Sequence, residues 1–336
     1  MPNLTDNILS VVYLILTLAV SVFSVCSFAF GTNFCVVLII VIVFLAATFY
    51  LVTHYIKFQT CTYKRITMVI PNLPDSLKGK KIAIASDFHM DKKRSCITDR
   101  LLEESVNLMT SMSPDAIFLL GDFLDNEHTA VSDMYASFDK LSAICPVLGI
   151  YGNHDYVGGN PSLLNDKFQA HGVTIVPNGY AVKLFNKIDV VGIDDLEQVT
   201  YNPSVLSSYC QHNRVNDGEY NPIFVITHNP ESTDHIKNYP VDAIFAGHTH
   251  GGQICVPSGT PLLKFWAKIP NAFWWSDKMR ARMEAVCNMK YIYGWYSEQC
   301  STNPDKKIQV LVSSGVGSHM GLRACCEPEV ILVTLA

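Results

Sequence analysis

Histidine side chains with metal-ligand spacing stand out in this 336-residue sequence. His248 and His250 lie two residues apart in the segment Gly-His-Thr-His-Gly-Gly-Gln, directly after the apolar run 243–246. At the end of a strand two such imidazoles can converge on one metal ion, and the glycines let main chain pass close to a bound group. Since a lone His-x-His pair is more often a surface or packed pair than a ligand pair, a metal site requires partners elsewhere in the chain.

Four other short apolar runs end in potential ligands of the same kinds. These runs are 82–85, 116–120, 147–151 and 223–226, and the polar side chains that follow them are Asp87, His89, Asp122, Asp125, Asn153, His154, Asp155 and His228. Short runs of Ile, Val, Phe and Leu bounded by Gly, Asp or Asn indicate buried strands of an α/β sheet. In such sheets ligands bind at the carboxyl ends of the strands, so we expect the five loops to gather at one edge.

The elements between these runs are predicted from apolar spacing. Spacings of three and four predict helices after Thr98 and over 131–141, and Asn160-Pro161 predicts the start of another that ends near Gly172. The runs 173–176, 181–185 and 188–193 follow one another without helical spacing, so we expect a second, partly antiparallel sheet that packs on the first. Further strands are predicted at 308–313 and 330–335.

Two segments near the start of the sequence, 8–30 and 34–56, contain no Asp, Glu, Lys or Arg. Each exceeds the roughly 20 residues that cross a bilayer as a helix. Together they predict a transmembrane hairpin within residues 1–57, followed by a linker and edge strand over 58–77 and a soluble domain over 78–336. A cleaved signal peptide is the alternative for the first segment. Signal peptides begin with a positively charged region, but the residues before this segment include Asp6 and contain no Lys or Arg.

The charges and cysteines favour a cytoplasmic location for the soluble domain. Lys57, Lys64 and Arg65 follow the second apolar segment, which by the positive-inside tendency predicts a multi-pass protein of the inner (cytoplasmic) membrane with its domain in the cytoplasm. The 11 cysteines are odd in number and lack disulfide-module spacing, which favours reduced thiols. The net charge of -5 argues against general nucleic-acid binding. The sequence does not indicate an oligomeric state.

The segment 257–305 is predicted to be the least regular part of the domain. It contains all four tryptophans and interleaves Lys278, Arg280 and Arg282 with apolar residues. This mixture fits a membrane surface or a groove for acyl chains. A loop insertion that covers the core with its aromatic side chains fits it equally well.

The candidate ligands together predict two metal ions. Carboxylate, amide and imidazole groups without a thiolate favour Mn²⁺, Fe, Zn²⁺ or Mg²⁺ over soft metals, and we expect Mn²⁺ first. The set is too large for one ion. We therefore expect two divalent ions in each chain.

The order of these motifs resembles the calcineurin-like metallophosphoesterase superfamily. Five motifs occur in a fixed order over 87–250: Asp-x-His, Gly-Asp-x-x-Asp, Gly-Asn-His-Asp, His and Gly-His-x-His. The Gly-Gly-Gln that follows the last motif and the glycines of 313–317 are similar to the membrane-associated branch of this superfamily. The resemblance implies an α/β fold, a four-layer sandwich of two mixed β-sheets flanked by helices. It implies that one ion is held by Asp87, His89, Asp122 and His250, and the other by Asp122, Asn153, His228 and His248.

The resemblance also implies a hydrolase for phosphoester or pyrophosphate bonds. Two ions about 3.5 to 4 Å apart lower the pKa of a shared water, so a metal-bridging hydroxide is the expected nucleophile. His154 is expected to face the substrate and to protonate the leaving oxygen. Asp155 is a candidate to orient that imidazole or a ligand, and Asp125 to act similarly. For both carboxylates the alternative is a turn-forming Asp that caps local backbone.

The sequence indicates the type of reaction more clearly than it indicates the substrate. A membrane hairpin and an aromatic segment favour an amphiphilic phosphate, and the membrane-associated branch includes UDP-2,3-diacylglucosamine pyrophosphohydrolases of lipid A synthesis, among them a chlamydial type, which implies release of UMP. Arg94 and Arg323 are candidate substrate contacts, with a solvated surface position as the alternative. Two other functions stay open: a general membrane-bound phosphodiesterase or phosphomonoesterase, and a non-catalytic scaffold, which the complete ligand set disfavours.

Overall fold

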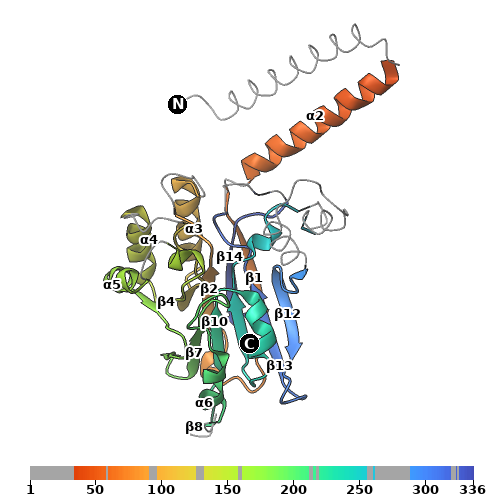
Figure 1. The fold of residues 1–336 in the computed structure, drawn as a ribbon. Helices are drawn as coiled ribbons and strands as arrows, with labels where there is room; N and C mark the ends of the chain where they lie inside the picture. The colour runs from red at the N-terminus through yellow and green to blue at the C-terminus, as the bar shows by residue number, and fades with distance from the viewer. Residues whose placement is uncertain are drawn as a thin grey trace. The chain divides into compact units, whose positions relative to one another are not determined.

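The computed structural model divides the chain into two units, Met1–Lys57 and Phe58–Ala336 (Figure 1). The residues that it describes are 34–57, 60–90, 97–125, 132–157, 161–211, 215–216, 219–255, 260–261, 288–318, 323 and 325–336.

The first unit is described through one helix, α2 (Phe34–Lys57). Several of its apolar side chains are exposed, including Ile40 and Val43. Across the described ranges, no helix has both the length and the apolar character needed to span a bilayer. The predicted span 8–30 lies outside the described residues, and the described part of the chain contains no transmembrane hairpin.

Six strands form the first sheet of the second unit. In spatial order they are β1 (Thr62–Met68), β14 (Glu329–Leu335), β2 (Lys81–Ala85), β3 (Ala116–Leu119), β4 (Val147–Gly149) and β5 (Val173–Ile175). β14 and β2 are antiparallel, and the other neighbours are parallel. All four residues of β3 are buried, as expected for a central strand covered on both faces.

Six further strands form the second sheet, which is also mixed. Their order is β12 (Gly294–Gln299), β13 (Lys307–Val312), β11 (Ala243–Ala246), β10 (Ile223–Thr227), β7 (Ile188–Ile193) and β6 (Ala181–Leu184). The pairs at the two edges are antiparallel and the pairs between them parallel. A separate short hairpin consists of β8 (Val215–Asn216) and β9 (Glu219–Tyr220).

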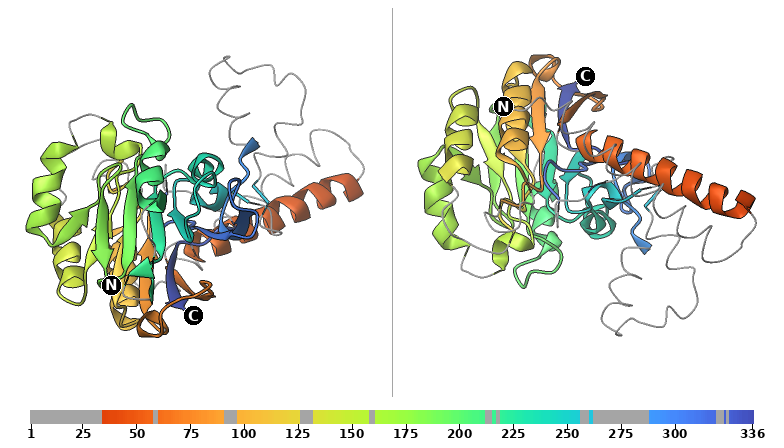
Figure 2. Two further views of the ribbon diagram at one scale, coloured as in Figure 1. Left: turned by 90° about the horizontal axis from the view of Figure 1, so that it is seen from below. Right: turned by 90° about the horizontal axis from the view of Figure 1, so that it is seen from above.

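Helices flank this pair of sheets (Figures 1 and 2). On the first sheet they are α3 (Asp99–Ser111), α4 (Ser132–Ser142) and α5 (Ser162–Ala170), and on the second α6 (Leu206–Gln211) and α7 (Thr233–Ile236). The predicted cap of α3 is present, since Thr98 accepts a hydrogen bond from Leu101 N at 3.1 Å. Single 3₁₀ turns lie at Asp75–Leu77, His154–Tyr156, Pro203–Val205, Pro230–Ser232 and His250–Gly252.

Three apolar clusters correspond to the three interfaces between four layers. One joins the outer face of the first sheet to its helices, as in the packing of Ile117 with Val106 and Phe138. The second lies between the sheets, where Phe118 meets Phe245 edge to face at 5.3 Å. The third covers the outer face of the second sheet, around Val225. The predicted arrangement of two mixed sheets flanked by helices is thus confirmed.

The assignment of strands to sheets differs from the prediction at two places. β10 and β11 belong to the second sheet and β5 to the first, although the sequence suggested the reverse grouping. An apolar run predicts that a strand is buried, but the partner of a strand depends on how the connections bring it back. Both sheets still direct the ends of these strands toward one region, so the expected gathering of loops does not depend on the grouping.

The region predicted to be irregular contains a regular strand, β12. Its residues alternate between partly and largely exposed, and it pairs with β13 at the edge of the second sheet. An edge strand of this kind has no buried apolar run, so the sequence pattern does not reveal it. Trp295 lies on β12, while the other three tryptophans lie outside the described residues.

Candidate active site

The predicted ligands come together where five strands end. β2, β3 and β4 of the first sheet lead to Asp87, His89, Asp122, Asn153 and His154, and β10 and β11 of the second sheet lead to His228, His248 and His250. Asp87, His89, Asp122 and His228 are fully or almost fully buried, whereas His154 retains 21% of its side-chain exposure. A solvent-accessible imidazole therefore stands beside a buried set of ligand-type groups.

Five of these residues adopt a left-handed backbone conformation, with φ values of 55° at Asp87, 47° at His89, 51° at Asp122, 72° at His248 and 49° at His250. Positive φ is uncommon outside glycine, although Asp and His tolerate it better than most residues. Main-chain hydrogen bonds between the loops hold these turns, among them Asp87 N to Gly121 O and His89 N to Asp122 O, each at 2.9 Å. Such conformations concentrate where a fold fixes functional side chains.

One cluster suited to a metal ion is formed by Asp87, His89 and His250. The Nε2 atoms of His89 and His250 are 3.1 Å apart, and Asp87 Oδ1 lies 3.7 Å from His250 Nε2. Asp122 Oδ2 is 3.4 Å from His89 Nε2. Two imidazole nitrogens and two carboxylates therefore face one small volume.

A second cluster is formed by Asp122, His228 and His248. Asp122 Oδ2 and His248 Nδ1 both lie 3.2 Å from His228 Nε2. Asn153 Oδ1 is 3.0 Å from His248 Nδ1 and adds a neutral oxygen. The same Asp122 oxygen thus faces both clusters, which is the position that a bridging ligand requires.

The protons of the imidazoles indicate that a cation fits here. His89 Nδ1 faces Asp125 Oδ1 at 3.2 Å, and His228 Nδ1 faces Leu120 O at 2.7 Å. Both partners only accept hydrogen bonds, so in each ring the hydrogen belongs on Nδ1 and the Nε2 lone pair points into the site. Lone pairs and carboxylate oxygens that face one another repel unless a positive charge lies between them. The residues present therefore fit a divalent ion in each cluster.

The buried carboxylates of the site attract positive charge. Although burial opposes it, Asp125 and Asp122 raise the pKa of His89, and Asp122 raises the pKa of His228, so protons on these two rings supply the positive charge that a bound ion would supply in their place. Burial lowers the pKa of His250 well below its ordinary value, and the charges of His89 and Arg323 lower it further. Burial alone would raise the pKa of Asp122, but the His228 and His89 imidazoles hold it well below its usual range. Asp122 is therefore a carboxylate and His250 a neutral imidazole, and these are the forms that bind metal.

Asp125 lies beside two imidazoles, as expected, whereas Asp155 makes the main-chain contacts of the alternative interpretation. Asp125 is fully buried, and its Oδ1 lies 3.2 Å from the Nδ1 atoms of both His89 and His154. Asp155 does not orient His154; its two oxygens accept hydrogen bonds from Gly152 N at 2.8 Å and Leu124 N at 3.0 Å. Burial and the nearby charge of Asp122 raise the pKa of Asp155 to about 7. Asp125 thus positions two functional imidazoles, whereas Asp155 ties two loops together.

A close approach between the β3 and β4 loops fixes Asp122. A Cβ atom on Gly152 would lie 2.2 Å from Asp122 Oδ1, so only glycine fits there. The next loop residue but one, His154, donates its backbone N–H to the same carboxylate oxygen at 2.8 Å. The Gly-Asn-His-Asp motif therefore holds Asp122, which follows β3, in position, and it also supplies the candidate ligand Asn153.

The two predicted arginine contacts have different outcomes. Arg94 lies outside the described residues. Arg323 is buried, and its guanidinium donates to the carbonyls of Ser314, at 2.7 Å, and Gly317. Arg323 therefore fixes main chain behind His250, and its position gives no support to a substrate contact.

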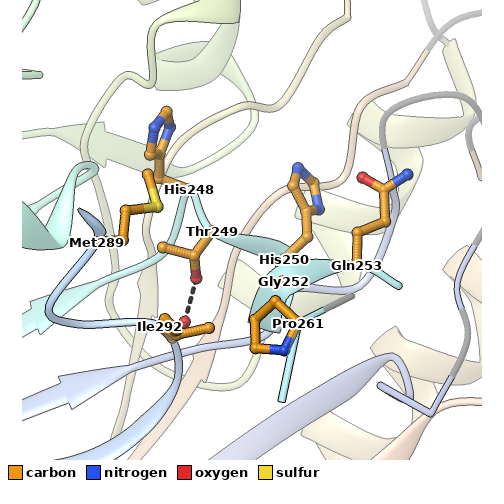
Figure 3. Close-up of a pocket in the computed structure, with 8 residues that line it drawn as sticks. All are labelled: His248, Thr249, His250, Gly252, Gln253, Pro261, Met289 and Ile292. Atoms are coloured by element: carbon orange, nitrogen blue, oxygen red, sulfur yellow. Dashed lines mark hydrogen bonds between the residues drawn. The ribbon is translucent and has the colours of Figure 1, made fainter. Parts of the chain in front are cut away.

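Sequence reasoning missed a cavity that adjoins the histidine pair. It is lined in part by Gln253, Pro261, Met289 and Ile292 (Figure 3). Gln253 follows the two glycines directly and has a φ of 54°, so the extended motif was the signal that could have found it. No comparable signal marks Met289 or Ile292, which reach the site from a distant part of the sequence.

The chain is similar to known metallophosphoesterases and phosphodiesterases. Three relatives are the uncharacterized metallophosphoesterase YkuE of Bacillus subtilis, 31% identical over 57% of this chain and 65% of its own; phosphodiesterase YaeI of Escherichia coli, 25% identical over 78% and 84%; and UDP-2,3-diacylglucosamine pyrophosphatase LpxG of Chlamydia trachomatis, 23% identical over 80% and 88%. The chain thus spans just under two thirds of the YkuE length.

The family model for calcineurin-like phosphoesterases matches residues 80–252, which contain every one of the clustered ligands. The chain belongs to the calcineurin-like phosphoesterase family and is a metal-dependent phosphoester hydrolase.

Proposed function

We propose that this protein hydrolyses a phosphoester or pyrophosphate bond with two divalent ions, Mn²⁺ first, held at the two clusters. The observation that carries the proposal is the position of Asp122 Oδ2, which faces His89 Nε2 at 3.4 Å and His228 Nε2 at 3.2 Å. Asp87, His89 and His250 would complete one ion site. Asn153, His228 and His248 would complete the other.

The ions and the protein divide the chemistry. When bound, two such ions supply an acidified water as the nucleophile and neutralise the phosphoryl oxygens. His154, the partly exposed imidazole, protonates the leaving oxygen in this scheme, because a departing alkoxide is a poor leaving group without a proton. The backbone carbonyl of Asp125 lies 2.9 Å from His154 Nδ1 and its carboxylate Oδ1 lies 3.2 Å away, so Asp125 holds the ring in place for that transfer.

We propose a lipid-linked phosphate as the substrate, at the cytoplasmic face of the inner membrane. The support is indirect: two chlamydial LpxG proteins, 23% and 22% identical, each align with 80% of this chain, and their names give UDP-2,3-diacylglucosamine as a substrate. The uncharged segments 8–30 and 34–56 favour a membrane location. Hydrolysis of UDP-2,3-diacylglucosamine would release UMP and a lipid monophosphate.

The test uses the full chain in detergent and a series of Mn²⁺, Zn²⁺, Fe²⁺ and Mg²⁺. Hydrolysis of bis-p-nitrophenyl phosphate reports the general reaction, and UMP release from UDP-2,3-diacylglucosamine reports the specific one. Metal-dependent hydrolysis that Asp122→Ala abolishes supports the reaction. Absence of hydrolysis with every metal contradicts it, and absence of UMP alone contradicts only the substrate.

A general phosphodiesterase is the second candidate. Phosphodiesterase YaeI is 25% identical over 78% of this chain and 84% of its own, a span comparable to that of LpxG. Cleavage of simple diesters without UMP release would favour this candidate. If the protein prefers monoesters to diesters, neither YaeI nor LpxG indicates its substrate.

A further inference from the structure

A cavity of about 200 Å³ lies against both ion clusters. His248 and His250, which belong to different clusters, form part of its wall, and in Figure 3 Ile292 and Pro261 lie across from them. A phosphoryl group held between the clusters therefore has this cavity directly beside it. A group esterified to that phosphate on this side has the cavity next to it.

Three residues give the cavity an apolar surface, and one of them, Met289, lies beside His248 (Figure 3). Pro261, Met289 and Ile292 supply hydrocarbon and thioether surface, and none of the eight described residues that line the cavity is Lys, Arg, Asp or Glu. The Thr249 hydroxyl donates to Ile292 O, so this polar group is already engaged. A second phosphate or another charged group in the cavity would lose water without gaining a charged partner among these residues.

The cavity is formed by well-fixed residues. A Cβ atom on Gly252 would lie 2.4 Å from Pro261 Cγ, which shows how closely this loop packs on Pro261. Ile292 N donates to the Tyr296 hydroxyl at 3.0 Å, and the backbone N–H groups of Lys290 and Tyr291 donate to Glu231 Oε1 at 2.9 and 3.1 Å. Pockets that hold their shape in this way impose selectivity on the groups that they accept.

We propose that this cavity is a specificity pocket for an uncharged, apolar group attached to the scissile phosphate. The proposal rests on the proposed function and adds the chemical class and size of the neighbouring group. At about 30 Å³ for each water-sized group, the cavity holds roughly seven such groups, equivalent to an alkyl chain of about six or seven carbons or to an aromatic ring. Longer chains extend beyond it.

A homologous series of alkyl p-nitrophenyl phosphodiesters, from methyl to dodecyl, tests the pocket with the Mn²⁺-loaded full chain. All members share one leaving group and differ only in the apolar group. We expect kcat/KM to rise by about two- to fourfold for each added methylene, since burial of a methylene corresponds to up to about fourfold. The rise should stop at about seven carbons, where the cavity is full.

Substitutions in the cavity wall test whether the dependence on chain length arises from this cavity. Met289→Ser with Ile292→Ser should lower kcat/KM for the heptyl ester by at least about tenfold and flatten the dependence on chain length. Ile144→Ser is the matched control, because Ile144 is also a partly exposed isoleucine, at 44%, but does not line the cavity. The control should retain the wild-type series.

Two results would overturn the inference: equal kcat/KM for all chain lengths in the wild-type protein, or a chain-length dependence that survives in the double variant. If no ester at all is hydrolysed, the proposed function fails, and the pocket is then judged by binding alone. Calorimetric titration with methyl to dodecyl phosphonates provides that readout. Affinity that grows to about seven carbons supports the pocket, and affinity independent of chain length rejects it.

Discussion

The two sheets contribute unequally to the active site. The loops of the first sheet supply both carboxylates, Asp87 and Asp122, together with the amide of Asn153, whereas the second sheet supplies only the imidazoles of His228, His248 and His250. Each ion cluster contains residues from both sheets. In the proposed site, the negative charge that would attract metal therefore resides on the first sheet, and the second sheet would complete the coordination with imidazoles.

Removal of the shared carboxylate should have the largest effect. Asp122→Ala takes the common oxygen from both clusters, so we expect loss of both ions and a fall in activity of more than about a thousandfold. Elemental analysis of the purified variant measures the ions. Asp115→Ala is the control, since Asp115 lies at the opposite end of β3 and pairs with Lys80 at 2.8 Å. Two bound ions in Asp122→Ala would refute the bridging role.

Removal of an imidazole from the second sheet should affect only one ion. His228→Ala leaves the cluster of Asp87, His89 and His250 complete, so we expect one ion per chain and a loss of activity of about a hundred- to a thousandfold. His235→Ala, in which an exposed histidine bonded to Tyr201 is replaced, should keep two ions. A variant of His228 that loses both ions would show that the sheets are not separable in this way.

Removal of His154 should separate metal binding from catalysis. His154→Ala should keep both ions and lose activity by about a hundredfold or more, because proton transfer to the leaving group is removed. The deficit should shrink with p-nitrophenol as the leaving group, which departs readily without a proton. His171→Ala is the control, since His171 makes a similar pair with Asp139 at 2.9 Å away from the site. Unchanged activity would exclude His154 from the reaction.

Loss of the carboxylate charge behind the imidazoles should have the smallest effect. Asp125→Asn keeps the shape of the side chain but removes the charge that faces His89 and His154, while the Asp125 carbonyl still accepts from His154 Nδ1, so we expect a loss of about 10- to 100-fold in activity. Metal affinity, measured by competition with a chelator, should fall for one ion only. Asp139→Asn repeats the change at the His171 pair and should leave both quantities unaltered.

The sequence predicted the layers and the ligands more fully than the pairing of strands. Buried runs such as 116–120 are visible because a strand covered on both faces is apolar throughout, and the ligands follow directly at the strand ends. The choice of sheet for β10 and β11 depends on connections that sequence periodicity does not encode. Strand β12 escaped prediction because only its hydrogen bonds to β13 define it.

Within the site, sequence reasoning identified the side chains but not their hydrogen-bond partners. Leu120 O fixes the tautomer of His228, and Gly317 O lies 3.3 Å from His250 Nδ1, yet every residue offers such a carbonyl and none is distinguished by type. Arg323 illustrates the opposite error, since it was expected to contact substrate or to lie in solvent and is instead buried against main-chain carbonyls.

The position of β14 in the first sheet determines when during synthesis that sheet can be completed. β14 lies between β1 and β2 in the first sheet, although its residues follow those of every metal ligand in the sequence. While the ribosome is still adding Glu329–Leu335, β2 lacks a neighbour on one side, and the turn that carries Asp87 and His89 lacks its full support. The first sheet beside this turn is therefore complete only after Glu329–Leu335 have been synthesised.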